Sequence, residues 1–153
     1  MSVSLIEFVI PGEPVAKGRA RTVPLMRDGR PVLGPGGRPV VLHHTPDKTA
    51  HYENLVKLAA QGAIGAAPPS ECAIRLTVHA TFTIPASWSA KRRTAVLGRP
   101  VTKRPDLDNV VKAVKDGLNG VAWRDDSQVA ELIARKVYGE CPGVRVSIVE
   151  VSP

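Results

Sequence analysis

Apolar and polar residues alternate most clearly in two segments, residues 72–84 and 143–151. This period of two predicts strands with one face buried. Residues 3–10 are rich in β-branched side chains and end at a Pro-Gly pair, which also indicates a strand followed by a turn. In the first of these strands the residues expected to face the core are Ile74, Leu76, Val78, Ala80 and Phe82.

Three further segments give weaker strand signals. Residues 40–42 and 121–123 are short apolar runs, each interpreted as a short strand or extended segment. The apolar positions in residues 128–138 fit either a helix or a strand. Gly and Pro follow this last segment closely, which favours a strand.

Two segments have the period of an amphipathic helix. The first runs from Pro46 to about Ile64, with Thr45 as the expected N-cap and Pro46 at the first helical position. The second spans residues 107–118 and ends at Gly120, a typical C-terminal capping residue. The expected apolar faces are Tyr52, Leu55, Val56, Leu58 and Ala59 in the first helix, and Val110, Val111, Val114 and Leu118 in the second.

A third, shorter helix is expected to open at Pro85 and Ser87, and the order of the elements then predicts an α+β fold. A chain of 153 residues suits one domain, spanning residues 1–153, with a mixed β-sheet and two principal helices. Residues 24–39 are crowded with Pro and Gly and include Arg27, Arg30 and Arg38. They predict a long flexible loop that either wraps nucleic acid or is solvated.

The charge of the chain points to a polyanionic partner. The net charge is +7 and the isoelectric point is near 9.9, which favours nucleic acid ahead of a membrane surface. No apolar run is long enough to cross a bilayer, and the N-terminus carries Glu7 instead of the basic region of a signal peptide. Cys72 and Cys141 lie far apart without metal-site spacing, so a reduced pair in the cytoplasm is expected.

Basic residues concentrate in two segments. Lys17, Arg19 and Arg21 alternate, so in an extended chain their side chains share one face. Six Lys or Arg and no acidic residue lie between Ile84 and Pro105. We expect both segments to contact DNA phosphates, although a charged edge strand and a solvated face are the plainer alternatives. The expected contacts are Lys17, Arg19, Arg21, Lys91, Arg92, Arg93, Lys103 and Arg104.

An acidic motif, KRPDLDNVVKAVKDGLNG followed by RDDSQ, comes directly after the second basic segment. Asp106 and Asp108 stand at the expected start of a helix, where carboxylates are stabilised by free N–H groups and the helix dipole. A purely structural interpretation is therefore open: Asp106 caps the helix and Asp108 pairs with Lys112 four residues on. Asp116 is likewise expected to pair with Lys112.

Three features favour a functional site over caps and ion pairs. Asp108, Lys112, Lys115 and Asn119 share one helical face opposite the valines, so that face is open to a ligand. The Asn-Gly return can bring the carboxylates of Asp125-Asp126 back near the helix start or the strand that precedes the helix. Acidic residues in a basic chain suit DNA if a metal bridges them to phosphate, and oxygen ligands suit Mg²⁺, with Mn²⁺ as a substitute. Lys112 would then stabilise charge on the phosphate, whereas Lys115 is open between phosphate contact and solvent.

Trp88 and Trp123 could stack on bases, but core packing or a dimer interface is the preferred interpretation. His43 and His44 are adjacent and would point to opposite sides of a strand, which argues against a shared metal site.

The acidic motif resembles the signature of the RusA-type Holliday junction resolvases, K-P-D-L-D-N-L-x-K-x-x-x-D-x-L-N-G followed by D-D-S-Q. The likeness extends to PGEPVAKGRAR near the N-terminus, to TPDKTAHYENLVK and to FTIPASWSAKRR, so it covers most of the chain in order. It departs in having Arg104 before Pro105, Ala20 between two arginines, and the Gly/Pro segment 24–39.

The resemblance implies a homodimeric, Mg²⁺-dependent endonuclease that nicks four-way DNA junctions symmetrically. It places the catalytic aspartates at Asp106, Asp108 and Asp126, which are also the implied metal ligands, and the essential lysine at Lys112. A metal-binding role for Asp125 is left open. Such enzymes are commonly encoded by phages or prophages, which implies action in a bacterial cytoplasm.

Two alternatives remain at the level of the sequence. One is a nuclease of the same metal chemistry that acts on other branched DNA, such as flaps or forks. The other is a basic DNA-binding or architectural protein without catalysis, in which the aspartates are helix caps and ion-pair partners. Loss of activity in Asp→Asn variants would separate the enzyme from the architectural protein.

Overall fold

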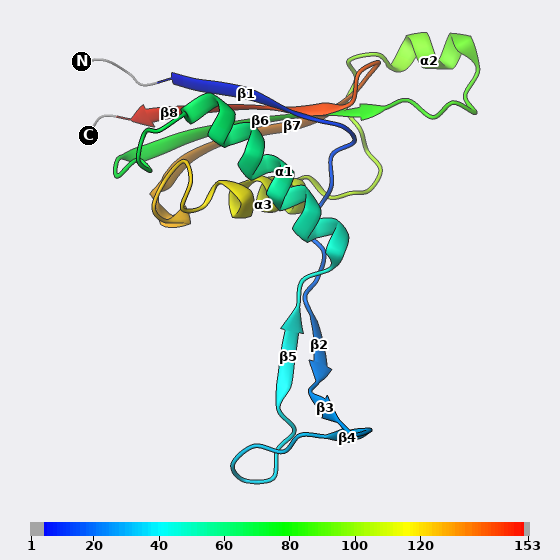
Figure 1. Cartoon of the computed structure of the whole chain (residues 1–153). Helices are drawn as coiled ribbons and strands as arrows, with labels where there is room; N and C mark the ends of the chain where they lie inside the picture. The colour runs from blue at the N-terminus through cyan, green and yellow to red at the C-terminus, as the bar shows by residue number, and fades with distance from the viewer. Residues whose placement is uncertain (1–4, 152–153) are drawn as a thin grey trace.

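A four-stranded mixed sheet, in the order β1-β8-β6-β7, lies at the centre of the molecule (Figure 1). Residues 5–151 are described by a computed structural model. β1 pairs antiparallel with β8 and β8 antiparallel with β6, whereas β6 and β7 are parallel. The strands are β1 (Leu5–Pro11), β6 (Ala73–Thr83), β7 (Val129–Gly139) and β8 (Gly143–Val151).

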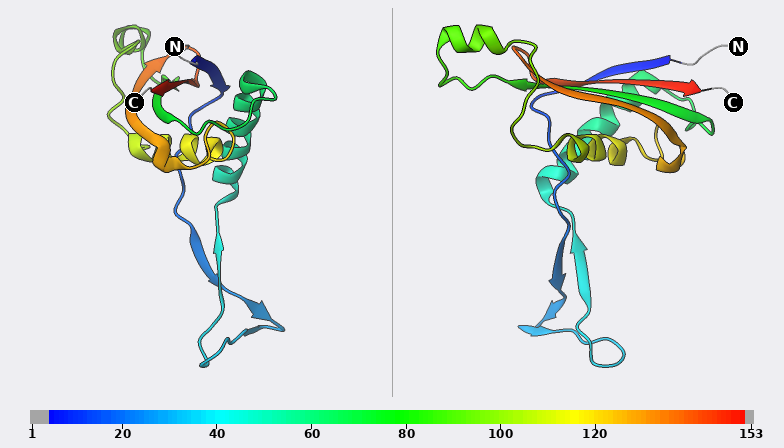
Figure 2. Two further views of the ribbon diagram at one scale, coloured as in Figure 1. Left: turned by 90° about the vertical axis from the view of Figure 1, so that its left-hand side faces the viewer. Right: turned by 180° about the vertical axis from the view of Figure 1, so that it is seen from behind.

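Two helices, α1 (Asp47–Ile64) and α3 (Leu107–Leu118), cover one face of this sheet (Figures 1 and 2). A shorter helix, α2 (Ala90–Val96), lies beyond the C-terminal end of β6, and a 3₁₀ helix, η1 (Asp126–Gln128), precedes β7. Parallel strands need a long crossover connection, and α2, α3 and η1 form the one between β6 and β7. The predicted α+β fold with a mixed sheet is confirmed, and the acidic motif lies in the crossover.

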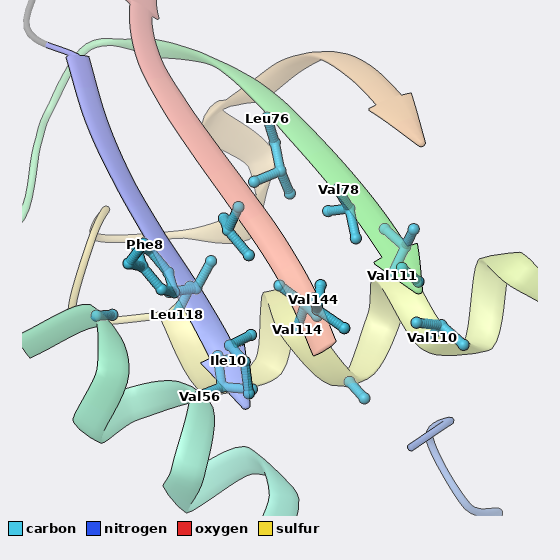
Figure 3. Packing of buried hydrophobic residues seen from close by; sticks show 14 of the residues in the cluster. Phe8, Ile10, Val56, Leu76, Val78, Val110, Val111, Val114, Leu118 and Val144 are labelled. Atoms are coloured by element: carbon cyan, nitrogen blue, oxygen red, sulfur yellow. The ribbon is translucent and has the colours of Figure 1, made fainter. Parts of the chain in front are cut away.

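The core lies between the sheet and the two helices. Each apolar residue predicted to face inward from β6 is buried, and so is the valine and leucine stripe of α3. In Figure 3, Leu76 and Val78 extend from the sheet on the side where α3 carries Val111 and Val114. Burial of each such side chain stabilises the fold by about 1.5–3 kcal/mol, which fixes α3 firmly against the sheet.

The two principal helices approach closely at Gly117. A Cβ atom at this position would lie 2.7 Å from the Cβ of Val56 and 2.9 Å from the carbonyl oxygen of Glu53 on α1. Glycine is unfavourable inside a helix by about 1 kcal/mol relative to alanine. The contact with α1 explains why the chain nevertheless carries glycine there.

Residues 21–44 project from the body on the side of the helices (Figures 1 and 2). Residues 21–44 are here called the β-arm. The sequence predicted a long loop over residues 24–39, but the whole β-arm is a hydrogen-bonded ribbon. Three of its Gly residues occupy turns with positive φ: Gly29 at 75°, Gly36 at 82° and Gly37 at 72°. The paired strands are β2 (Arg21–Pro24) with β5 (Val41–His44), and β3 (Met26–Arg27) with β4 (Arg30–Pro31).

Several predicted boundaries differ from the structure. α1 begins at Asp47 with Pro46 as its N-cap, so Thr45 does not cap the helix. α2 begins later than Pro85, because the Ser89 hydroxyl accepts the hydrogen bond that caps its N-terminus. Residues 121–123 form a turn with isolated bridges and not a strand, because Trp123 is drawn into the core.

Other predictions agree with the structure. Residues 128–138 correspond to strand β7, which settles the helix-or-strand ambiguity. In α1, Tyr52 and Val56 are buried as expected, but Leu58 is 66% exposed and does not belong to the apolar face. Val3 and Ser4 of the predicted first strand lie outside the described residues. Within residues 5–151, no helix combines the length and the apolar character needed to cross a bilayer.

Candidate active site

The start of α3 presents the first two acidic residues of the motif. Asp106 occupies the N-cap position with an extended backbone, but its side chain makes no capping hydrogen bond. Because the valines of α3 face the core, Asp108 and Lys112 lie on the exposed side of the helix. The plain interpretation of Asp106 as a capping side chain is therefore not supported, and its carboxylate is available to a ligand.

A cavity of about 620 Å³ runs along the exposed side of α3. Its polar lining comes from Asp108, Lys112, Lys115, Asp116 and Asp126, and its apolar lining includes Leu132 and Ala134 of β7. The predicted return of the chain toward α3 is thus present in the structure: Asp126 of η1 lines the same cavity as Asp108 and Lys112. Three carboxylates and two lysines bordering one open cavity can bind a cation and a phosphate together.

Asp126 is held in place by a buried tryptophan. The indole Nε1 of Trp123 donates a hydrogen bond of 2.9 Å to Oδ1 of Asp126, and Trp123 is fully buried. Gly120, with a φ of 75°, turns the chain after α3, and its N–H donates to the carbonyl of Trp123 at 2.8 Å. One oxygen of Asp126 is therefore fixed by the core, which positions the carboxylate at the cavity.

Asp125 has a different role from its neighbour. Its carboxylate accepts hydrogen bonds from the hydroxyl and, at 3.0 Å, from the backbone N–H of Ser127, forming a capping box with Gln128. These bonds from Ser127, with a smaller contribution from the charge of Lys115, lower the pKa of Asp125 below its usual value. Asp125 therefore shapes the turn that carries Asp126.

Gln128 ties this turn to the sheet. Its amide nitrogen donates to the carbonyls of Ser70 at 2.8 Å and Cys72 at 3.0 Å, while its oxygen accepts from the backbone N–H groups of Arg124 and Asp125. The four bonds satisfy the full hydrogen-bonding capacity of the side chain. Sequence reasoning did not assign this role, although the D-D-S-Q motif contains the residue.

Lys136 of β7 fixes the segment before α3. Its ammonium group donates to the carbonyl of Lys103 at 2.6 Å and to that of Pro105 at 2.7 Å. The contact orients the chain that leads into Asp106. No spacing in the sequence connects Lys136 with the motif, since only the fold of β7 beside this segment brings them together.

Asp106 itself borders a second hollow of about 680 Å³, on the other side of the α3 N-terminus. Arg19, Arg104 and Asn109 also line this hollow. The structure therefore brings Asp108 and Asp126 to one cavity and Asp106 to the adjoining one. Within the described residues, no three side chains of the types His, Cys, Asp and Glu form a ready-made metal site.

Lys17 is engaged inside the protein. Its ammonium group lies 2.5 Å from Oε1 of Glu53 on α1 and 2.7 Å from Oδ2 of Asp116 on α3. Partial burial acts to lower the pKa of Lys17, but the bonds with Asp116 and Glu53 raise it overall above the usual value. The predicted pair between Asp116 and Lys112 is thus replaced by a pair with Lys17, which lies in the segment between β1 and β2, and the charge of Lys17 is compensated within the protein.

The second basic segment surrounds a half-buried aromatic residue, Trp88. The guanidinium of Arg92 lies 3.6 Å from the ring centroid of Trp88, and the ammonium of Lys103 lies 5.1 Å from it. The ring packs edge-on against Tyr138, with centroids 5.6 Å apart. α2 buries none of its residues, so Lys91 and Arg93 project into solvent. Trp123 lies in the core, as expected, whereas Trp88 organises the surface cations.

Comparison with known proteins agrees with this geometry. The family model for the endodeoxyribonuclease RusA matches residues 11–149. The chain is also 36% identical over 151 residues to the uncharacterized protein YqaN of Bacillus subtilis (strain 168), an alignment that covers 96% of this chain and 97% of YqaN. The family match spans nearly the whole described fold, including both cavities beside α3. The chain therefore belongs to the RusA endodeoxyribonuclease family.

Proposed function

We propose that this protein is a Mg²⁺-dependent endonuclease that resolves four-way DNA junctions by paired symmetric nicks in DNA recombination and repair. The observation that supports it most strongly is the cavity where Asp108 and Lys112 of α3 meet Asp126 of η1. If these residues acted only as helix caps and ion-pair partners, nothing would require their side chains to border the same open cavity. Mn²⁺ is the expected substitute, and a bacterial cytoplasm is the proposed place of action.

The side chains fit a magnesium ion that is completed by its substrate. Mg²⁺ is commonly held by one or two protein carboxylates, with waters and substrate phosphates filling the remaining positions. Asp108 and Asp126 supply two such carboxylates at one cavity. The bound ion would supply an activated water and neutralise charge at the scissile phosphate. A closed cage of three protein ligands is not required for this chemistry.

The other residues have distinct roles in the proposal. Lys112 borders the same cavity and stabilises the negative charge that develops on the phosphate. Asp106, whose carboxylate is not used in capping, completes the acidic set from the adjoining hollow once DNA is bound. Asp125 is assigned to the turn and not to the metal, because it lines neither cavity and its Oδ2 accepts both bonds from Ser127.

DNA phosphates are proposed to meet the cations around the two cavities. Arg19 and Arg104 line the hollow beside Asp106, and Lys115 borders the metal cavity. Lys17 is left out of this surface because Glu53 and Asp116 already match its charge. The remaining proposed contacts are Arg21, Lys91, Arg92, Arg93 and Lys103.

A homodimer is proposed because resolution needs two cuts. Two strands of like polarity must be nicked at symmetric points, and a two-fold pair of active sites achieves this. Leu5, Val9 and Ile133 are each more than half exposed, and their strand positions place them on the sheet face away from the helices. Leu5 and Val9 on β1 and Ile133 on β7 lie at opposite edges of the sheet, with Ser147 and Thr77 between them. The three apolar residues do not form the continuous apolar patch that marks an interface, so no contact surface is assigned to the dimer.

A substrate panel tests the proposal. Purified protein in Mg²⁺ would be incubated with a four-way junction, a fork, a flap and linear duplex of matched sequence, and every labelled strand would be mapped. Paired nicks confined to the junction, by a species that sediments as a dimer, support a resolvase. Equal cutting of flaps or forks would instead favour a nuclease of broader branched-DNA specificity.

A further inference from the structure

The β-arm is highly exposed for a two-stranded ribbon. All residues of β2 and β5 are exposed on both sides of the ribbon. An isolated two-stranded ribbon is only marginally stable in water. Val23, Met26 and Leu42 are each about half exposed as well, with values from 46% to 52%. The ribbon thus has the character of a surface that is covered by a partner.

The charge of the β-arm indicates which partner. Asp28 is the only acidic residue in the arm. Its four arginines are exposed, and among residues 5–151 none of them forms a salt bridge with a carboxylate. A second copy of this arm would bring like charges together, whereas a polyanion would neutralise them. These arginines are Arg21, Arg27, Arg30 and Arg38.

The β-arm also begins at the active site. Arg19, two residues before the arm, lines the hollow that contains Asp106. From there the ribbon extends away from the body (Figure 1). Residues 21–27 span about 23 Å at roughly 3.3 Å per residue. That length is about two thirds of a helical turn of DNA, which is about 34 Å, and a two-stranded ribbon is narrow enough for the major groove.

We propose that the β-arm binds the duplex flank of the DNA substrate, with Arg27, Arg30 and Arg38 contacting phosphates away from the cleavage point. This inference rests on the proposed action on branched DNA for the position of the duplex, but not on cleavage itself. The arm thereby holds one duplex arm of the branched substrate while the cavities beside α3 take the strand that is cut.

The test compares two triple variants that remove the same charge. Arg27→Gln, Arg30→Gln and Arg38→Gln are combined in the arm variant. The matched control carries three neutral substitutions at exposed cations outside the arm and both cavities, namely Lys57→Gln, Arg135→Gln and Arg145→Gln. Each variant lowers the net charge of +7 by three. All six sites are exposed, and thermal melting verifies that both variants fold.

Binding to a four-way junction and to linear duplex is then measured in Ca²⁺ over a range of salt. Three lost phosphate contacts should flatten the slope of log K against log salt by about 2.7, so that between 50 and 200 mM salt the arm variant loses about 40-fold less affinity than wild type. The control should retain the wild-type slope. Hydroxyl-radical footprinting should show that the arm variant loses protection of the duplex flank but keeps it at the branch.

Two outcomes would overturn the proposal. One is a salt slope for the arm variant equal to that of the control. The other is a change from dimer to monomer in sedimentation with the salt slope intact, which would identify the arm as a contact between copies. Cleavage assayed in parallel in Mg²⁺ separates the two proposals: wild type that binds through the arm without cutting would contradict only the resolvase function.

Discussion

The bond between Trp123 and Asp126 allows the charge of Asp126 to be separated from its structural role. Oδ1 accepts from the indole N–H at 2.9 Å, and the tryptophan is fully buried. Asp126→Asn keeps an oxygen that can accept this bond but removes the negative charge. Asp126→Ala removes both the charge and the acceptor. The two variants should therefore behave alike in catalysis and differently in stability.

The expected magnitudes follow from the surroundings of the indole. A buried donor without a partner costs about 1–3 kcal/mol, so Asp126→Ala should lose that much free energy of unfolding. For a chain of this size the loss lowers Tm by about 2–12 °C. Asp126→Asn should melt within about 2 °C of wild type. Mutation of residues that only orient a metal ligand lowers metal affinity or activity about 10–100-fold. Removing the charge of a ligand itself should therefore reduce cutting by both variants at least about 100-fold.

Thermal melting and junction cleavage in Mg²⁺ measure the two effects on the same preparations. The reasoning fails if Asp126→Asn cuts as fast as wild type, since the carboxylate charge would then have no catalytic role. It also fails if Asp126→Asn is destabilised as much as Asp126→Ala, because the amide would then not replace the carboxylate as acceptor for Trp123.

Further predictions concern the helix crossing, the segment before α3, the surface cations and a buried phenol. Gly117→Ala places a Cβ 2.7 Å from Val56, and such overpacking costs about 1–3 kcal/mol, whereas alanine gains about 1 kcal/mol of helix propensity over glycine. The net free energy of unfolding, measured in urea, should fall by up to about 2 kcal/mol, and an increase would contradict the contact. Lys136→Met should slow junction cleavage while preserving DNA affinity, because it releases the Lys103 and Pro105 carbonyls; unchanged turnover would refute that positioning role. Neutralising residues 91–93 should weaken junction binding and flatten its salt dependence in titrations, and an unchanged slope would show that α2 is not in contact with DNA. Burial raises the pKa of Tyr52 to about 12 from 10.0, so its contribution to stability is complete below pH 10 and is lost as pH rises toward 12. Between pH 10 and 12, the free energy of unfolding of Tyr52→Phe should therefore fall less steeply than that of wild type. Identical pH profiles for the two proteins would contradict the raised pKa.

The sequence predicted the parts of the fold that depend on local periodicity. Inward residues of β6 were assigned correctly because a strand buries alternate side chains, and the α3 stripe because a helix buries every third or fourth. The shared helical face of Asp108 and Lys112 follows from the same geometry. Leu58 was assigned wrongly to the apolar face of α1: it lies two residues from both Val56 and Ala60, which are fully buried, so it is on the opposite side of the helix and faces solvent.

The sequence could not predict contacts that join distant segments. Lys17 looked like a DNA contact because it alternates with two arginines, but the crossing of α1 and α3 supplies it with two carboxylates. Two further contacts also depend on the fold and not on local sequence pattern. They are the hydrogen bond from Trp123 to Asp126 and the bonds from Lys136 to the segment before α3. In the β-arm, Gly and Pro suggested a loop because their turns are visible in sequence, whereas the pairing between the turns is not.

The measurement that tests the central claim most directly is strand-mapped cleavage of a mobile four-way junction by wild type and Asp108→Asn, in Mg²⁺ and in Ca²⁺. The cavity shared by Asp108 and Asp126 predicts paired symmetric nicks by wild type in Mg²⁺ alone. It predicts no cutting by Asp108→Asn, which should still bind the junction. Tight binding by wild type without cutting in any divalent metal would contradict the account and identify the protein as an architectural DNA-binding protein.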